Sequence, residues 1–139
     1  MGRERSLEVM NRYLNDVLSE RRLEVIEEIA AEDMKDYSQE IPGRAGLVHH
    51  VRDFWRIFPE VEIKVLRTVA EENQVVGIWR FRGVPKEEYW GIKPNGTSVE
   101  VVVWSCFRLA DGLVTDYWLT YNALDAITQM GAEILDPTA

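Results

Sequence analysis

The feature that most constrains the fold is a change of hydrophobic period at Pro59. Before this proline, apolar residues recur every three or four positions, which is the spacing of one helix face. After it they alternate, which is typical of strands with one buried face. A chain with helices first and hairpin-connected strands second favours an α+β fold, in which helices cover one face of a mostly antiparallel sheet.

Three helices are predicted before Pro59. The first two are RSLEVMNRYLNDVLSE (5–20) and RRLEVIEEIAAEDM (21–34), and KDYSQ (35–39) has the pattern of a short strand. The third helix runs from about Ala45 to Phe58 and ends at Pro59, whose ring cannot continue a helix.

Four strands are predicted after Pro59, namely VEIKVLRTV (61–69), QVVGIWRFRG (74–83), VEVVVWSCFRLA (99–110) and LVTDYWLTY (113–121). Residues 84–98 form a long loop with two prolines and an Asn-Gly pair, and ALDAITQMG (123–131) forms a short final turn or helix. We therefore expect one domain over residues 1–139: three N-terminal helices packed on a strongly curved sheet, as a cone-shaped α+β barrel with a pocket between the third helix and the sheet.

Composition excludes several classes of partner. The net charge of −8 and the lack of a basic, aromatic-laced stripe argue against nucleic acid. The sequence contains no apolar stretch of about 18 residues, so no membrane-spanning helix is expected. Cys106 is the only cysteine, and neither a His-x-x-x-His pair nor a carboxylate cluster occurs, so we expect no disulfide, no metal and a cytoplasmic protein.

His50 is the strongest candidate for moving a proton. On the third helix it shares the apolar face with Leu47, Val51 and Phe54, so it should point inward, whereas His49 lies on the solvent-facing flank. Histidine has its ordinary pKa near neutral pH, so an inward imidazole suits a general base. The alternative is a core histidine that makes one hydrogen bond to the backbone.

The C-terminal half resembles the SnoaL-like polyketide cyclases. The resemblance rests on Gly91, Pro94, Asn95-Gly96 before a strand, on the DGLVTDYWLTYN strand, and on Gln129-Met130-Gly131. The stretch GRAGLVHHVRDFWRIFPEVEI also resembles the family, and the likeness runs from about Ala31 to Gly131. It implies the nuclear-transport-factor-2-like cone, a ring closure by intramolecular aldol chemistry, and no cofactor.

The resemblance also places the site. It turns the face with Leu113, Thr115, Tyr117, Leu119 and Tyr121 toward the pocket, and puts Asp36 near the pocket mouth, where it either orients His50, acts as the base itself or is a solvated acid. The family's proton-transferring aspartate position holds Leu119, and its later aspartate position holds Asn122. The family's usual acid/base is therefore absent, and His50 with Asp36 are the predicted catalytic pair.

The many aromatic residues suit a flat, apolar and polycyclic ligand, although core packing explains them equally well. Glu87 and Glu88 are either carboxylates on a lid or a solvated pair. The residues predicted to contact the ligand are Tyr37, Phe54, Trp79, Tyr89, Trp90, Ser105, Tyr117, Leu119 and Tyr121.

Three functions remain open at this point. The first is a cofactor-free cyclase or isomerase for a polyketide- or terpenoid-like molecule, with a relocated acid/base. The second is a non-catalytic carrier of an apolar metabolite, which Leu119 favours. The third is epoxide opening, for which we find no paired acid and base.

We also expect a homodimer through the outer sheet face. Val102, Trp104, Cys106, Val114 and Trp118 should make that face too apolar for water. Asp116 falls on the same outer face, where it is expected to pair with Arg108 or Arg80 or to join the dimer contact.

Overall fold

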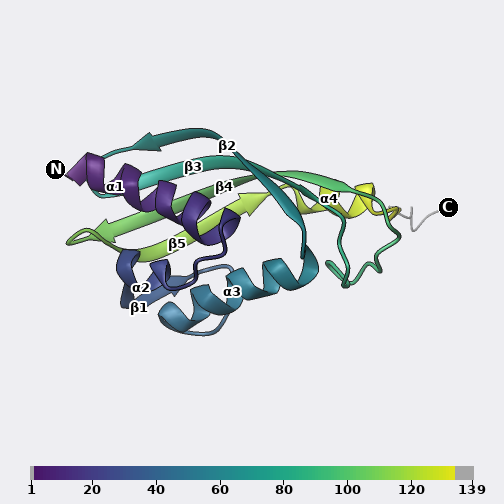
Figure 1. Cartoon of the computed structure of the whole chain (residues 1–139), viewed down its shortest axis with the longest axis horizontal. Coiled ribbons are helices and arrows are strands. Elements are labelled where there is room, and N and C mark those ends of the chain that lie inside the picture. The colour runs from purple at the N-terminus through teal and green to yellow at the C-terminus, as the bar shows by residue number, and fades with distance from the viewer. Residues whose placement is uncertain (1, 134–139) are drawn as a thin grey trace, which may run out of the picture.

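A computed structural model describes residues 2–133 and confirms the predicted α+β class (Figure 1). Five strands form one sheet in the order β1-β5-β4-β3-β2. Their bounds are Ala30–Asp36 (β1), Val61–Ala70 (β2), Gln74–Gly83 (β3), Val99–Ala110 (β4) and Leu113–Tyr121 (β5). Neighbours from β2 to β5 are antiparallel, and β1 runs parallel to β5. The sheet is curved but does not close on itself, and β1 and β2 are its edges.

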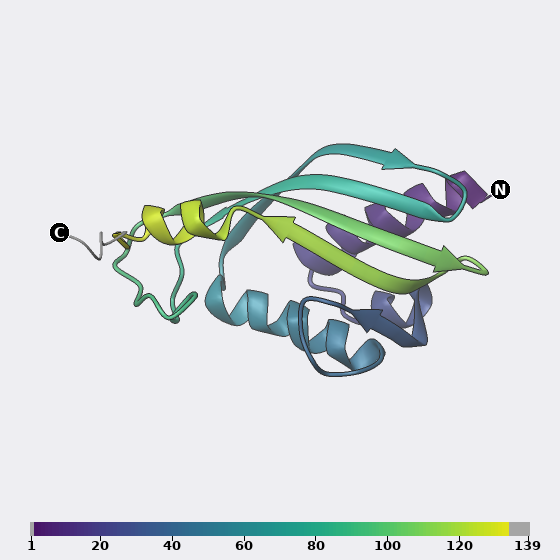
Figure 2. The same ribbon diagram turned by 180° about the vertical axis from the view of Figure 1, so that it is seen from behind.

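The helices are α1 (Gly2–Asn11), the π-helical segment η1 (Arg12–Ser19), α2 (Val25–Ile29), α3 (Arg44–Ile57) and α4 (Ala123–Gln129). The long helix α1–η1 crosses one side of the sheet, in front of the strands in Figure 1 and behind them in Figure 2. Close approach is possible because β3 carries Gly77, where an added Cβ would lie only 2.8 Å from the sulfur of Met10. No helix within residues 2–133 is long and apolar enough to cross a bilayer.

The second predicted helix is much shorter than expected. Only Val25–Ile29 is helical, and the following residues form β1, with Met34 and Asp36 buried in strand alternation. Pairing with β5 satisfies the backbone of this segment, so the tertiary contact overrides a helical pattern that continued through Met34. This change matters for function because Asp36 is the last residue of β1.

A bulge in β5 corrects the predicted facing of its first residues. Arg108 pairs with Asp116, but the next residue, Leu109, pairs with Val114, so β5 carries one extra residue. A bulge shifts the alternation by one position, and Val114 is therefore fully buried instead of lying on the outer face. Thr115, expected in the pocket, instead donates a hydrogen bond to the carbonyl oxygen of Arg108. Beyond the bulge, Tyr117, Leu119 and Tyr121 face the cavity as predicted.

The outer sheet face keeps an exposed apolar patch of Val102, Trp104 and Trp118, with exposures of 43%, 52% and 37%. We expect sedimentation at micromolar concentration to find a homodimer, because a second copy removes this patch from water. Trp104→Arg should yield monomers, whereas Ile41→Arg, at an exposed apolar side chain in the loop before α3, should not. A monomeric wild-type protein contradicts this prediction.

Candidate active site

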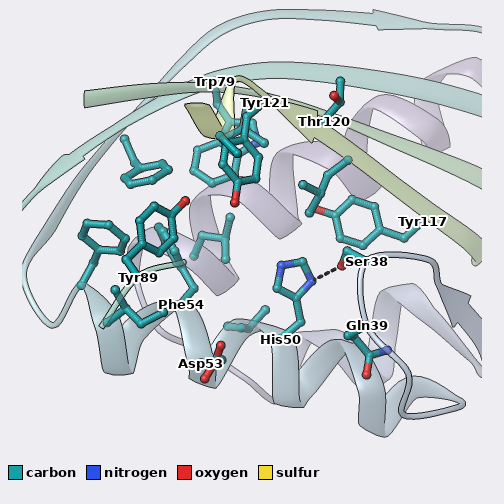
Figure 3. Close-up of a pocket in the computed structure, with 18 of the residues that line it drawn as sticks. Ser38, Gln39, His50, Asp53, Phe54, Trp79, Tyr89, Tyr117, Thr120 and Tyr121 are labelled. Carbon is teal, nitrogen blue, oxygen red and sulfur yellow. Dashed lines mark hydrogen bonds between the residues drawn. The ribbon is translucent and has the colours of Figure 1, made fainter. Parts of the chain in front are cut away.

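A cavity of about 610 Å³ opens between α3 and the sheet (Figure 3). Helix α3 contributes His50 and Phe54, the strands contribute Trp79 and Tyr117, and the loop between β3 and β4 contributes Tyr89. The size falls in the range of small-molecule sites. The cavity therefore lies between the third predicted helix and the sheet, as expected from the sequence.

His50 and Asp36 meet at this cavity. The Nδ1 atom of His50 lies 2.7 Å from Oδ2 of Asp36 and 3.0 Å from Oγ of Ser38. The Asp36 side chain is fully buried, whereas 25% of the His50 side chain remains exposed. Parallel pairing of Asp36 with Tyr117 on β5 fixes the position of the carboxylate. Asp36 thus lies behind the imidazole and does not line the cavity.

The surroundings of Asp36 keep it ionised. Burial raises the pKa of its carboxyl, but hydrogen bonds from His50 and from the backbone and hydroxyl of Ser38 outweigh burial, so the pKa falls below its ordinary value. A carboxylate only accepts, so Nδ1 of His50 carries the proton that it donates to Asp36. The other ring nitrogen, Nε2, is then the basic one. Among residues 2–133, Nε2 has no hydrogen-bond partner.

A buried polar chain supports the ring beside His50. Tyr117 stacks on the imidazole, with ring centroids 5.9 Å apart. Its hydroxyl lies 3.0 Å from Oγ of Ser105, which also accepts the indole N–H of Trp79 at 3.0 Å. Burial raises the pKa of Tyr117, so this phenol stays neutral. Ser105 itself is fully buried behind the wall, so its predicted contact with the ligand is wrong.

Most of the other predicted ligand-contacting residues line the cavity, and contact with a ligand stays a prediction for each of them. They are Phe54, Trp79, Tyr89, Trp90, Tyr117, Leu119 and Tyr121. Tyr13, Phe58 and Phe81 also line it and were missed. Phe81 alternates with Trp79 on one strand face, which was a usable signal. Tyr13 and Phe58 lie in helical apolar stripes that look the same whether they pack in a core or border a cavity.

Tyr37 is a further correction. It follows the inward Asp36 on the chain and so points outward, with 53% of its surface exposed. Its ring stacks on Trp118 at 5.0 Å, and its hydroxyl donates to Asp116 at 2.9 Å. Asp116 therefore lies on the outer face as predicted, with Tyr37 as a partner, and the guanidinium of Arg108 packs over Trp118.

Several polar residues at the cavity opening or on the loop between β3 and β4 are exposed to solvent. His49 is exposed as predicted, although it borders the opening together with Asp53. Glu87 forms an exposed ion pair with Arg56 at 3.7 Å, and Glu88 is also exposed. Within residues 2–133, no group of three or more His, Cys, Asp and Glu side chains is arranged to hold a metal ion.

Solved structures place the fold among known proteins. A candidate SnoaL-like polyketide cyclase from Jannaschia sp. CCS1 is 21% identical, with a TM-score of 0.84 and 96% of each chain covered. TsrD from Streptomyces laurentii is 19% identical, with a TM-score of 0.86 and coverage of 96% of this chain and 99% of that one. IdmH from Streptomyces antibioticus, a candidate polyketide cyclase, is 20% identical, with a TM-score of 0.76 and coverage of 91% and 99%. At these identities the likeness shows the fold alone.

The protein family is identified by a match to a family model. Comparison with curated protein sequences gave no match. The model described as SnoaL-like polyketide cyclase matches residues 8–130, which include α3, all five strands and both His50 and Asp36. The chain therefore belongs to the SnoaL-like polyketide cyclase family.

Proposed function

We propose that the protein is a cofactor-free enzyme of the cyclase or isomerase type, with His50 as general base. One observation carries the proposal: Nδ1 of His50 is held 2.7 Å from a buried carboxylate, while the ring borders an aromatic cavity. In this arrangement Asp36 is a positioning residue, because it reaches the substrate only through His50. Its full burial and its three hydrogen-bond donors argue against the earlier alternative, in which Asp36 itself is the base.

The substrate is a flat, apolar carbonyl compound of polyketide or terpenoid character. Rings of Phe54, Phe58, Trp79 and Phe81 pack edge-to-face around the cavity, with centroids 4.9–6.1 Å apart. Such walls favour flat hydrocarbon surfaces over charged ones. Membership of a cyclase family supports the same class of substrate.

The chemistry begins at the carbon next to a carbonyl. Nε2 of His50 takes a proton from that carbon, and the electron pair of the C–H bond passes into an enolate. The enolate carbon then attacks a second carbonyl of the same molecule and closes a ring, or it regains a proton at another carbon and the product is an isomer. The imidazolium returns the proton in either case.

A non-catalytic carrier is the second candidate. Leu119 favours it, because this side chain borders the cavity at the position that holds the proton-transferring aspartate in the pattern the sequence resembles. The aromatic walls suit a carrier as well as an enzyme. The contact between the imidazole of His50 and a buried carboxylate, in contrast, has a role in proton transfer but none in binding an apolar ligand.

Deuterium exchange separates the two candidates. We expect the protein to accelerate the uptake of deuterium from D₂O by 2-tetralone, a bicyclic ketone with acidic C–H bonds, as followed by mass spectrometry. Protein unfolded in urea should give only the buffer rate. Quenching of tryptophan fluorescence by 2-tetralone without faster exchange supports the carrier and contradicts the enzyme.

A further inference from the structure

Three aromatic residues with polar groups form a cluster at the cavity, apart from the His50–Asp36 contact. The indole N–H of Trp90 donates to the hydroxyl oxygen of Tyr121 at 2.7 Å. Tyr89 belongs to the same cluster, and burial raises the pKa of its phenol, so Tyr89 keeps its proton. Figure 3 shows the hydroxyls of Tyr89 and Tyr121 turned into the same space as the His50 ring.

The loop that carries Trp90 is built to hold this contact. Tyr89 and Ile92 pair through two backbone hydrogen bonds of 3.0 Å around a turn at Trp90 and Gly91. Trp90 has a φ of +52°, a left-handed conformation that is rare for a bulky residue. Burial does not explain it, because 62% of Trp90 is exposed. Its bond to Tyr121 is the specific contact that this conformation secures.

The same loop is anchored to α3, the helix that carries His50. The backbone N–H of Lys86 donates to the carbonyl oxygen of Ile57 at 2.8 Å, and the Tyr89 ring packs on Phe58 with centroids 5.4 Å apart. Loop, helix and β5 thus hold the Tyr121 hydroxyl and the imidazole around one cavity.

We infer that Tyr121 donates the hydrogen bond to the carbonyl oxygen of the substrate, and that Trp90 positions and polarises its hydroxyl. This inference rests on the proposed function, and it names a second residue that acts on the substrate in addition to the base His50. Tyr121 lies two residues beyond Leu119 on the same strand face, about 7 Å further along β5. The Tyr121 hydroxyl is thus offset by one strand repeat from the position that Leu119 fills.

The electron flow in this arrangement is balanced. When Nε2 of His50 removes the proton, the C–H pair forms a carbon–carbon double bond and the carbonyl pair moves onto oxygen. That oxygen accepts the O–H of Tyr121. The indole N–H of Trp90 on the Tyr121 oxygen stabilises the negative charge that reaches it, and this donor is in place before the reaction. The ligand class is a ketone with its oxygen at Tyr121 and its acidic C–H bond at His50.

The test uses 2-naphthol, a flat phenol whose ionised form mimics the enolate oxygen and fluoresces differently from the neutral form. We expect the wild-type protein to bind naphtholate in preference to naphthol, so that the bound probe ionises at a lower pH than the free probe. Tyr121→Phe should weaken naphtholate binding about 10-fold to 100-fold and leave neutral naphthol binding nearly unchanged.

Two further variants sharpen the result. Trp90→Phe keeps a ring but loses the N–H, so it should cause a smaller loss in the same direction. Tyr37→Phe removes a phenol from the outer sheet face and should change nothing. Wild-type binding without a preference for naphtholate, or an unchanged preference in Tyr121→Phe, overturns the inference. Because naphthol binding needs no turnover, a loss in Tyr121→Phe supports the donor even if 2-tetralone exchange fails and the proposed function falls with it.

Discussion

Replacing His50 by alanine should lower the rate of 2-tetralone exchange by about 10²–10⁴-fold, the usual cost of losing a general base. Among the residues that line the cavity, His50 combines a basic nitrogen with a buried carboxylate partner. The protein should remain folded, because the imidazole is partly exposed and its removal opens space into an existing cavity. Circular dichroism and the midpoint of urea unfolding check this.

The matched control is Asp116→Asn. Asp116 also contacts a tyrosine, but it does so on the outer sheet face, where its partner is Tyr37. This variant should keep nearly full activity. If Asp116→Asn abolishes exchange while His50→Ala retains it, the assignment of the two faces is wrong. If neither variant matters and the ketone still binds, the carrier is the better explanation.

The orientation of His50 was predictable because α3 is regular. Its apolar stripe continues from Leu47 through Val51 to Phe54, and the helical period places His50 next to that stripe. The period-two strands were predictable for the same reason, since alternation along β3 and β4 is unbroken. Where the hydrophobic period is regular over a whole element, it predicts both whether the element is a helix or a strand and which of its faces is buried.

The errors occur where long-range contacts override the local period. Residues 30–34 look helical, yet they form β1 by pairing with a strand more than 80 positions away in the chain. Val114 was placed outside because a bulge cannot be read from alternation alone. Tyr37 was placed in the pocket beside Asp36, but adjacent strand residues face opposite ways, so Tyr37 points outward where Asp36 points inward.

The contact between Asp36 and His50 was only partly predictable from the sequence. Its two members were singled out from chemistry and from the family resemblance, but their 2.7 Å separation depends on β1, whose extent was not predicted. The Trp90–Tyr121 bond depends on a tight turn within a long loop, which sequence places only coarsely. For a site of this kind, the sequence therefore predicts which residues take part, but not the distances and hydrogen bonds between them.

Asp36→Asn should disable the base without removing it, with a loss of exchange rate of about 10²–10⁴-fold. The carboxylate accepts from His50 on Oδ2 and from the backbone N–H of Ser38 on Oδ1. An amide offers one oxygen and one NH₂ group, so it cannot accept from His50 and from Ser38 at the same time as the carboxylate does. When the NH₂ group faces His50, Nδ1 becomes the acceptor and Nε2 carries the proton, which is the wrong tautomer for a base.

The same substitution should lower the free energy of unfolding by about 1–3 kcal/mol at pH 7, because a neutral amide replaces a carboxylate whose hydrogen bonds are charge-assisted. The pH dependence identifies the carboxylate as the cause. The pKa of Asp36 is lower in the folded protein than in the unfolded chain, so its ionised form stabilises the fold above the unfolded value, near pH 3.9, and this stabilisation is lost as the pH falls through the folded value. Urea titrations of both proteins should therefore differ most at neutral pH and converge below about pH 4. A gap that stays constant through that range means that Asp36 is not held as a carboxylate, and the positioning of His50 then needs another explanation.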